Sequence, residues 1–236
     1  IKHIYDLCKK CNYVDKVIVA TSKEQSDNEL YEYCIQNKID IYRGSLKNVL
    51  SRFVEIIDIY NPKFVVRVTG DCPFIYPTFI DKQIKIMDET NTDFVKPIKE
   101  SDILCGQGVH SSKSILHVSK ISNNIEDFEH VGSPYFNKNH HEFEIVGINI
   151  PEKLEKCKYR LTVDVEKDLK VAKIIYENLW HNQPLDLINV INWLDSNPRI
   201  AKHNFFVEES EINSSLKALK KDSIFNLKKV FNWDEI

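Results

Sequence analysis

The sequence predicts an α/β protein in which helices cover both faces of a mostly parallel mixed sheet, giving three layers. Two observations carry this prediction. Short apolar runs alternate along the chain with stretches in which apolar residues recur every three to four positions, which are the patterns of strands and helices. The early runs are apolar throughout, as expected of parallel strands buried on both faces. Regular alternation of strand and helix favours a parallel sheet covered on both sides.

The first 98 residues supply the clearest elements. Strands are expected at residues 15–21, 39–42, 64–66 and 93–98, and helices at 4–11, 26–36, 45–60 and from Pro77 onward. Ser45 is the expected N-cap of the helix that follows it. Asn61 and Pro62 end that helix, and Pro77 suits the first turn of the next one.

The pattern is weaker in the second half of the chain. Residues 106–108 predict a turn and 112–119 a short helix. Residues 142–150 alternate like a half-exposed strand, and 159–165 predict a strand that leads into a helix. After Pro184 a short helix is expected to end near residue 197.

The last segment differs from the rest in composition. It is polar with scattered aromatic residues, and Ile224, Leu227 and Phe231 predict a small amphipathic helix. We therefore expect a domain at residues 1–198 and a helical C-terminal appendage at 199–236.

Composition excludes several classes of protein. The 236 residues are 42% hydrophobic and 28% charged, with a formal net charge of -3. These values are ordinary for a globular protein and show no basic surplus for nucleic acid. No apolar run is long enough for a membrane span. The six scattered cysteines are best explained as reduced thiols, and Cys8 and Cys11 fit an apolar helix stripe better than half a zinc site or a redox pair.

The most informative motif is the turn that follows the apolar run at residues 64–66. Its sequence is Thr69-Gly70-Asp71-Cys72-Pro73. Ligands of open α/β sheets bind just beyond the carboxyl ends of the strands. A carboxylate delivered there is well placed to hold a divalent cation against phosphates. The alternative is a solvated turn aspartate, because Gly-Asp turns are common.

Asp164 is the natural partner for Asp71. It lies at the end of the strand expected at 159–165 and precedes a helix. Two strand-end aspartates would suit Mg²⁺, which takes one or two carboxylates together with phosphates and water. The alternative makes Asp164 a helix N-cap. Asp168, one turn further on, would hold a metal-bound water or favour the positive end of the helix.

Basic and histidine side chains provide further candidates. Arg43, Arg52 and Arg67 lie at or near strand ends, and a guanidinium matches phosphate oxygens. Gly44 follows Arg43 directly, beside an expected helix N-terminus. The alternatives are surface charge for Arg52 and a structural ion pair for Arg67. The pair Glu129-His130 offers an acid or base, although a histidine in a loop is more often structural.

Five segments together resemble a known family. They are residues 17–21 (VIVAT), 43–53 (RGS followed by VLSRF), 66–73 (VRVTGDCP), 129–131 (EHV) and 160–164 (RLTVD). In this order they resemble the cytidylyltransferases that activate acidic sugars, and most of all the branch named for spore-coat polysaccharide biosynthesis. The resemblance covers about residues 4 to 179.

The resemblance implies a nucleotide-diphospho-sugar transferase fold of the Rossmann-like type. It also implies a Mg²⁺-dependent reaction in which a sugar hydroxyl attacks the α-phosphorus of CTP, giving a CMP-sugar and pyrophosphate. The matching positions assign metal binding and catalysis to Asp71 and Asp164. We assign nucleotide binding to Arg43, Gly44, Arg52, Arg67, Thr69 and Gly70, and sugar binding to Glu129, His130 and Arg160.

Two departures from the family pattern affect these expectations. The family opens with a strand and a loop rich in Gly, Arg and Lys that cradles the triphosphate, and nothing like it lies before Ile1. We expect roughly 30 upstream residues, enough for a strand, a loop and a helix cap, and little activity without them. At residues 105–110 the family commonly has a glycine followed by an acidic stretch, so the sugar remains open.

Two other functions stay open. One is a sugar-nucleotide glycosyltransferase on the same fold, which would release nucleoside diphosphate. The other is a non-catalytic homologue or fragment that serves in assembly. For the main hypothesis the partners are CTP and a small sugar, with no nucleic acid and no membrane. A homodimer is left open, and the need for CTP predicts a cytoplasmic protein.

Overall fold

The computed structural model describes residues 1–99, 101–204 and 225–236. Its first half contains α1 (Lys2–Cys8), β1 (Val19–Ser22), η1 (Gln25–Asp27), α2 (Asn28–Gln36), β2 (Ile41–Gly44), α3 (Val49–Tyr60), β3 (Phe64–Val68), α4 (Pro77–Thr90), β4 (Phe94–Pro97), η2 (Asp102–Leu104), β5 (Gln107–Ser111) and α5 (Ser112–Ile121). The second half contains α6 (Ile125–Glu129), α7 (Ser133–Lys138), η3 (His140–Glu142), β6 (Ile145–Asn149), α8 (Glu152–Glu155), α9 (Glu166–Leu179), α10 (Leu187–Ser196), α11 (Pro198–Ala201), β7 (Val230–Asn232) and η5 (Trp233–Glu235).

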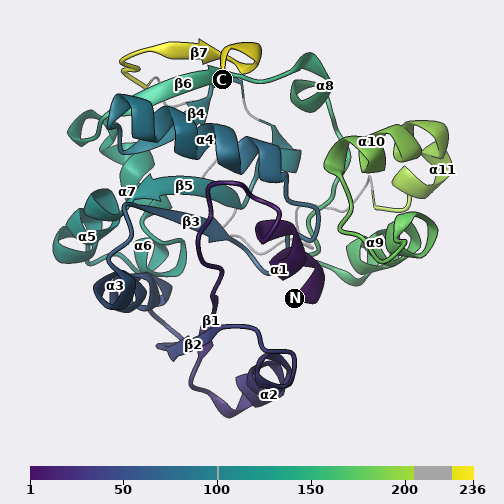
Figure 1. Ribbon diagram of the computed structural model, residues 1–236, viewed down its shortest axis with the longest axis horizontal. Coiled ribbons are helices and arrows are strands. Elements are labelled where there is room, and N and C mark those ends of the chain that lie inside the picture. The colour runs from purple at the N-terminus through teal and green to yellow at the C-terminus, as the bar shows by residue number, and fades with distance from the viewer. Residues whose placement is uncertain (100, 205–224) are drawn as a thin grey trace.

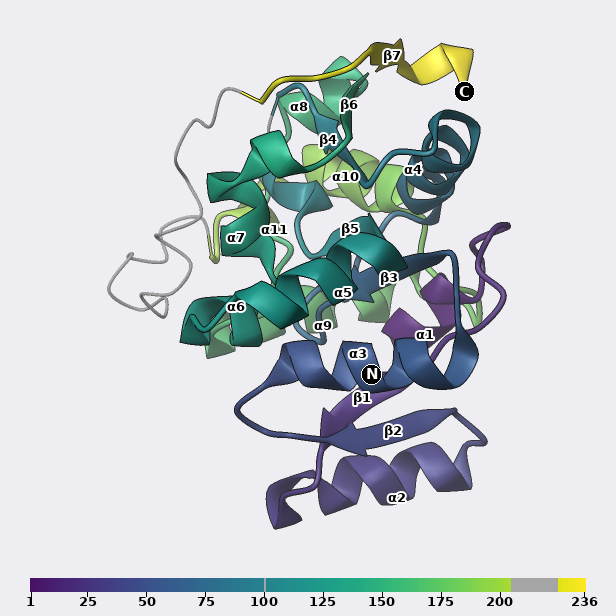
Figure 2. The same ribbon diagram turned by 90° about the vertical axis from the view of Figure 1, so that its left-hand side faces the viewer.

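The strands form two separate sheets. Five of them lie in the order β3-β5-β4-β6-β7, and β1 pairs with β2 alone. The pairs β1–β2, β4–β6 and β6–β7 are parallel, whereas β5 is antiparallel to both of its neighbours. The two-stranded sheet and α2 stand apart from the larger sheet, with α3 beside them (Figures 1 and 2). The five-stranded sheet is therefore mixed and mostly parallel, as predicted, because β5 alone runs against the other four strands.

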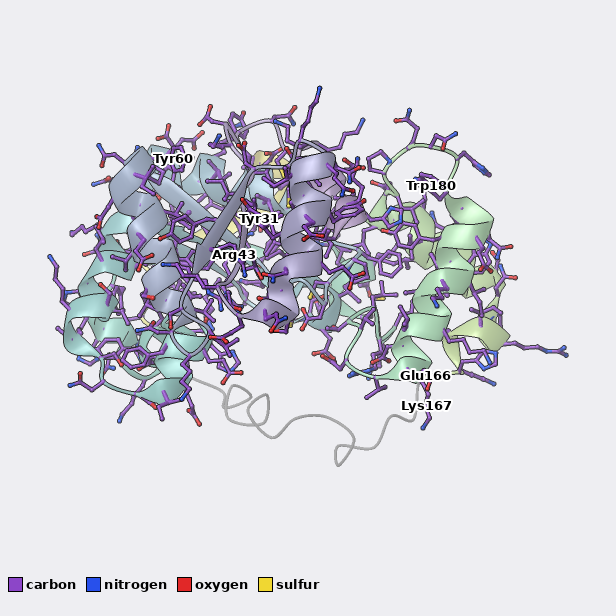
Figure 3. All side chains as sticks on the ribbon, turned by 90° about the horizontal axis from the view of Figure 1, so that it is seen from below. Tyr31, Arg43, Tyr60, Glu166, Lys167 and Trp180 are labelled. Atoms are coloured by element: carbon purple, nitrogen blue, oxygen red, sulfur yellow. The ribbon has the colours of Figure 1, made fainter. Side chains whose placement is uncertain are left out.

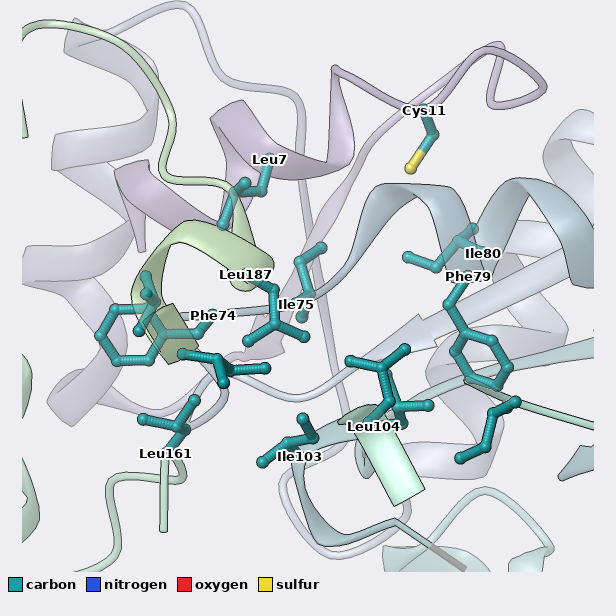
Figure 4. Close-up of a cluster of buried hydrophobic side chains, with 14 of the residues drawn as sticks. Leu7, Cys11, Phe74, Ile75, Phe79, Ile80, Ile103, Leu104, Leu161 and Leu187 are labelled. Carbon is teal, nitrogen blue, oxygen red and sulfur yellow. The ribbon is translucent and has the colours of Figure 1, made fainter. Parts of the chain in front are cut away.

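Helices pack on both faces of the larger sheet and make two apolar cores. The larger core joins α1, α4, α9 and α10 to one face of the strands, and includes Leu7, Ile80 and Leu187 (Figure 4). The second joins α3, α5 and α7 to the other face. Neighbouring residues of one strand divide between the cores, since Ile145 faces the second and Val146 the first. The fold thus has the predicted three layers.

Several predicted elements are confirmed with small shifts. Pro77 begins α4 in its first turn, and the helix expected at 112–119 is α5. Cys8 and Cys11 are buried free thiols of the larger core. The N-cap of α3 is Asn48, whose side chain accepts from Ser51 N, so the prediction of Ser45 was wrong. Ser45 instead accepts from the backbone N–H of Asn48, one step earlier in the same turn.

Two predicted elements are wrong for a shared reason. Residues 159–165 form no strand, and residues 230–232 form strand β7 on the edge of β6 where a helix was expected. The backbone partners of the first segment include Asp71 O, and those of the second lie on β6. Such distant partners leave no trace in local periodicity. Ile224 lies outside the described residues, and the boundary between domain and appendage stays a prediction.

Candidate functional site

The Thr69-Gly70-Asp71 turn directly follows β3, as predicted. Thr69 N donates to Gly106 O at 3.1 Å, and Cys72 N donates back to Thr69 O at 3.2 Å. Gly106 has a φ of +68°, and a Cβ there would lie 2.4 Å from Thr69 Oγ1 and 2.7 Å from Cys72 Sγ. Only glycine therefore fits against this turn. Asp71 itself is exposed, and nothing lies within 4 Å of a Cβ placed on Gly70, so a ligand could approach closely.

A backbone hydrogen bond brings Asp164 to this turn. Val163 N donates to Asp71 O at 2.8 Å, which fixes the segment before α9 against the end of β3. Burial raises the pKa of Asp164, and the nearby charge of Asp71 adds to the increase while Arg160 opposes it. The two carboxylates therefore share one electrostatic environment. Asp164 reaches it from a loop and not from a strand end, and the N-cap of α9 is Val165.

Asp168 holds this loop in place. Its buried carboxylate accepts two hydrogen bonds from Arg160, at 2.9 and 3.0 Å, and one from Asn204 at 2.9 Å. It also accepts from the backbone N–H groups of Asp164 and Val165, at 3.1 and 3.2 Å. Burial alone would raise the pKa of Asp168, but these hydrogen bonds outweigh it and lower the pKa. Asp168 is thus a structural anchor, a role that was not among the two weighed for it from the sequence.

Arg160 links the anchor to the candidate site. Its Nη2 donates to Asp164 at 2.5 Å as well as to Asp168. Arg160 was predicted to bind the sugar, but its guanidinium is occupied by two carboxylates. It thereby fixes the orientation of Asp164.

The carboxylate pair fits a magnesium ion. In the described part of the chain, no group of three or more His, Cys, Asp or Glu side chains could hold a metal. Mg²⁺ does not require such a group, because it is commonly bound by one or two carboxylates, substrate phosphates and water. Asp71 accepts a single side-chain contact, from Cys72 Sγ at 3.4 Å, and keeps most of its oxygen lone pairs available. Asp71 and Asp164 are the residues that would hold the ion.

Arg67 and Glu129 lie beside Asp71. Burial lowers the pKa of Arg67, and the charges of Asp71, Cys72 and Glu129 act in the opposite direction. Arg67 is on β3, whereas Glu129 ends α6 on the neighbouring side of the cavity that both residues line. Arg67 is partly buried and lines the cavity, and its guanidinium is suited to an anionic ligand such as a phosphate.

The segment after Glu129 has an unusual backbone. Val131 is buried and has a φ of +54°, which is uncommon for a β-branched residue. The preceding His130 carries a buried Nε2 atom with no hydrogen-bond partner. Strain and an unsatisfied polar atom of this kind are concentrated at functional sites. Glu129 and His130 therefore remain candidates for contact with substrate.

The other predicted phosphate ligands lie at the ends of β1 and β2. Arg43 donates to Ser22 O at 2.8 Å and Glu24 O at 2.9 Å, and stacks over Tyr31 (Figure 3). Arg52 is buried and donates to three carbonyls, those of Ser45, Ala20 and Leu46. A Cβ on Gly44 would lie 2.7 Å from Arg52 Cγ, so glycine makes room for that side chain. Arg43 and Arg52 thus hold neighbouring segments of the β1–β2 region together through hydrogen bonds to backbone carbonyls.

A cavity of about 1000 Å³ separates the two groups of candidates. Residues 17–21 line one side of it and residues 64–70 the other. We call it the interstrand cleft. Arg67, Thr69, Gly70 and Glu129 line it, whereas Arg43, Gly44 and Arg52 do not. The structure thus joins Asp71, Asp164, Arg67 and Glu129, and leaves Arg43 and Arg52 across the cleft.

Sequence reasoning missed two residues near the site. The close approach of Thr69 and Cys72 requires a glycine at position 106. The sequence predicted only a turn at residues 106–108. His110 lies on β5, where burial lowers its pKa to about 4 with further lowering from Arg67 and Lys96. Only the pairing of β5 with β3 brings His110 near Arg67, so no sequence signal pointed to it.

Comparison with known proteins agrees with this geometry. The cytidylyltransferase family model matches residues 1–212. The spore coat polysaccharide biosynthesis protein SpsF of Bacillus subtilis is 26% identical over 187 residues, which are 79% of this chain and 78% of that protein. A cytidylyltransferase structure from Leptospira borgpetersenii aligns with a TM-score of 0.74 at 22% identity, covering 84% of each chain.

A more distant structure shares the fold. CMP:2-keto-3-deoxy-manno-octonic acid synthetase complexed with CTP aligns with a TM-score of 0.53 at 12% identity, covering 76% of this chain and 88% of that one. The fold is that of the nucleotide-sugar transferases, and the family match extends over most of the chain. The chain therefore belongs to the cytidylyltransferase family.

Proposed function

We propose that this protein transfers a cytidylyl group from CTP to a sugar hydroxyl, giving a CMP-sugar and pyrophosphate for surface polysaccharide biosynthesis. The sugar belongs to the acidic class, and the need for CTP makes the activity cytoplasmic. Asp71 and Asp164 hold Mg²⁺ in this proposal. The ion would offset charge on the α-phosphate and on the leaving pyrophosphate.

One observation carries the proposal. The hydrogen bond from Val163 N to Asp71 O, 2.8 Å long, brings two carboxylates from distant parts of the sequence to one end of β3. Nucleotidyl transfer depends mainly on positioning and on charge neutralisation, and a rigid pair of carboxylates is suited to both. The described residues contain no helix that could span a membrane.

The remaining side chains take supporting roles. Arg67, Thr69 and Gly70 lie on the nucleotide side, where the open space at Gly70 admits a phosphate and Arg67 supplies positive charge. In this proposal Glu129 and His130 contact the sugar, and Glu129 lines the interstrand cleft. Arg160 orients Asp164 through a hydrogen bond, and in this proposal it acts on the sugar only indirectly, through Asp164.

The test is pyrophosphate release from CTP by the full-length protein. A panel of acidic sugars, including 3-deoxy-manno-octulosonate, is supplied with Mg²⁺. Asp71→Asn should lower turnover by roughly 10³-fold, the scale on which one lost charge-stabilising group acts. Asp88→Asn is the matched control, because Asp88 is an exposed carboxylate paired with Lys63 far from the turn.

Three outcomes would contradict the proposal. Full turnover by Asp71→Asn would remove Asp71 from the metal site. Release of nucleoside diphosphate from a nucleotide sugar would identify a glycosyltransferase instead. Absence of CTP binding by the full-length protein in calorimetry would indicate a non-catalytic homologue.

A further inference from the structure

Three neighbouring strands carry basic side chains on one face of the five-stranded sheet. In this sheet β5 lies between β3 and β4 (Figure 1). Arg67 on β3, Lys96 on β4 and His110 on β5 each follow a valine that packs in or against the larger core. Because successive side chains of a strand point to opposite faces, all three lie on the face of the second core.

Gly108 lies at the centre of this group. It is paired with Arg67 in the ladder of β3 and β5. His110 is paired with Phe94 in the antiparallel ladder of β4 and β5, so two residues further along each strand Lys96 comes opposite Gly108. Burial, and then the charges of Arg67 and Lys96, lower the pKa of His110 to about 4. Both cations therefore lie near the imidazole.

Gly108 leaves open space on this face of the sheet. Apart from its chain neighbours, a Cβ on Gly108 would have only the imidazole of His110 within 4 Å among the described residues, with Nε2 at 3.4 Å. Unlike Gly106, Gly108 does not have a left-handed backbone, so its conformation does not require glycine. We call the space above it, between β3 and β4, the β5 recess.

The imidazole of His110 has unused hydrogen-bonding capacity. It stacks on Phe136 at 4.7 Å between ring centroids, and its Nδ1 atom is buried without a partner. The ring is uncharged at neutral pH and carries one proton. Buried N–H groups without an acceptor are rarer than buried acceptors without a donor. We therefore assign the proton to Nε2, which lies beside the β5 recess.

The side chains around the β5 recess offer donors to a ligand. Arginine and lysine side chains carry donors and no acceptor, and His110 adds the N–H of Nε2. Lys96 Nζ donates to Asn137 Oδ1 at 2.9 Å, an uncharged partner that leaves the ammonium positive. Donors from two strands thus converge on one open position of the strand between them.

The nearby carboxylates belong to other contacts. Asp93 opposes the lowering of the His110 pKa, but its carboxylate accepts a hydrogen bond from the Ser111 hydroxyl at 2.7 Å. Glu129 acts on the charge of Arg67 and lines the interstrand cleft. Neither carboxylate lies within 4 Å of the position where a side chain on the central glycine would begin. The recess is therefore open to the carboxylate of a ligand.

The β5 recess lies beside the candidate site. Arg67 borders it, and the charge of Asp71 acts on the same guanidinium. Arg67 precedes Thr69 by two residues, a distance of roughly 7 Å along a strand. This is the scale of one sugar ring. A sugar held by an acid group in the recess would present a hydroxyl group toward Asp71.

We propose that Lys96 and His110 form a carboxylate subsite over Gly108 that binds the acid group of the sugar acceptor, with Arg67 between this subsite and the nucleotide side. A site made of donors alone pairs better with a carboxylate than with a hydroxyl, whose proton would find no acceptor. The subsite thereby selects acidic over neutral sugars. That its ligand is the acceptor rests on the proposed function, whereas the affinity of the recess for a carboxylate does not.

The first test is steady-state kinetics of the full-length protein with CTP and the acidic sugar that the panel identifies. Lys96→Met should raise KM for the sugar by roughly 20-fold, the scale of one lost hydrogen bond to a charged group, and leave KM for CTP unchanged. Lys96→Arg keeps the charge and should stay close to the unmodified protein. Lys99→Met is the matched control, because Lys99 is an exposed lysine paired with Glu155. An unchanged KM for the sugar, or a higher KM for CTP instead, would overturn the proposal.

The second test examines the recess by itself. Acetate and acetamide have the same shape, but only acetate is charged. In NMR titrations of the full-length protein at constant ionic strength, acetate should shift the Gly108 amide and the His110 ring nitrogens saturably, and acetamide should not. Gly108→Asp places a carboxylate in the recess and should abolish the saturable response at His110, while the amide spectrum reports that the variant is folded.

The two tests separate this proposal from the proposed function. Equal responses to acetate and acetamide, or a response at His110 that survives in Gly108→Asp, would overturn the carboxylate subsite even in a protein that uses CTP. Saturable acetate binding by a protein that releases no pyrophosphate would contradict the proposed function and support the subsite.

Discussion

The two sides of the interstrand cleft are stabilised in different ways. The five-stranded sheet lies between two apolar cores, and a buried carboxylate anchors the loop that carries Asp164. In the region of β1, β2 and α2, the buried apolar side chains are Cys34 and Ile39, and Arg52 connects three carbonyls. Tyr31 and Ile35 of α2 are exposed.

The predicted site residues fall on opposite sides of the cleft and differ in what their side chains contact. Asp71, Asp164, Arg67 and Glu129 lie together on the side with the larger cores. Arg43 and Arg52 lie on the other side, where their donors are used by backbone carbonyls. The comparison teaches that backbone and buried-carboxylate hydrogen bonds hold the Asp71 and Asp164 segments together on one side of the cleft, whereas the opposite side depends mainly on hydrogen bonds from Arg43 and Arg52. Figure 3 shows Arg43 and Trp180 at well-separated places on the molecule.

The largest expected effect concerns activity on the carboxylate side. Asp164→Asn should lower cytidylyl transfer by roughly 10³-fold, because one of the two carboxylates proposed to hold the metal loses its charge. The fold should survive, since Arg160 keeps its two hydrogen bonds to Asp168. Steady-state pyrophosphate release, measured beside the circular dichroism spectrum, checks both statements. An unchanged rate would show that Asp164 has no part in the chemistry.

The next effect concerns the stability of the same loop. Asp168→Asn leaves Arg160 with Asp164 alone and removes a buried charge that accepts five hydrogen bonds. We expect a loss of about 3 kcal/mol in the free energy of unfolding. Urea denaturation measures it, with Asp88→Asn, an exposed carboxylate paired with Lys63, as the control. A loss no larger than that of the control would mean that the loop is held by its backbone alone.

On the opposite side of the cleft, Arg52 is the corresponding anchor. Arg52→Met keeps much of the side-chain volume but leaves the carbonyls of Ser45, Ala20 and Leu46 without this donor. We expect a loss of about 2 kcal/mol, since buried unsatisfied acceptors are costly. Lys47→Met, at an exposed position, should change stability little. If Arg52→Met lowers stability as little as Lys47→Met does, water replaces the guanidinium as the donor to these carbonyls. The two sides of the cleft would then be less different than the contacts suggest.

The smallest effect is a pH dependence at the end of β1. Hydrogen bonds from Ser22 and Thr21 lower the pKa of Asp27 to about 2 from an ordinary value of 3.8. Because the pKa is lower in the folded state, this contribution is fully present above pH 4 and is lost as the pH falls toward 2. It should amount to at most about 1 kcal/mol at this partly exposed position.

The measurement compares the unmodified protein with Asp27→Asn by urea denaturation between pH 5 and pH 2. Other carboxylates contribute equally to both proteins and cancel in the difference. The stability difference should shrink as the pH falls. A difference that stays constant over this range would show that the charge of Asp27 has no stabilising role.

Local sequence patterns predicted much of the fold. The apolar run at 64–66, the turn at Asp71 and the proline at the start of α4 are all found where expected. Each depends on neighbours within a few residues, and so does the apolar stripe of α3, whose Leu50 and Ile57 are buried. The turn that carries Asp71 was located by such signals, and the roles assigned to the site residues stay predictions.

Apart from the N-cap of α3, where Asn48 takes the role predicted for Ser45 within one turn, the failures involve distant partners. The segment before Asp164 looked like a strand because its apolar residues alternate, but its backbone bonds to the Asp71 turn and to the side chain of Asn204. β7 was read as part of a helix because Leu227 and Phe231 are four residues apart, yet an edge of β6 was available to pair with it. Arg52 is a residue type that often binds phosphate, but in the folded protein it is buried and its guanidinium donates to backbone carbonyls.

The sequence by itself determined which residues form helices and strands around β3, and that a carboxylate follows that strand. It did so because periodicity records which face of each element is buried. Only the tertiary structure decided that Asp164 lies beside Asp71, that Asp168 anchors it through Arg160, and that β1 and β3 face each other across an open cleft. These arrangements depend on hydrogen bonds and edges shared by segments far apart in the chain, and no local pattern encodes such pairings.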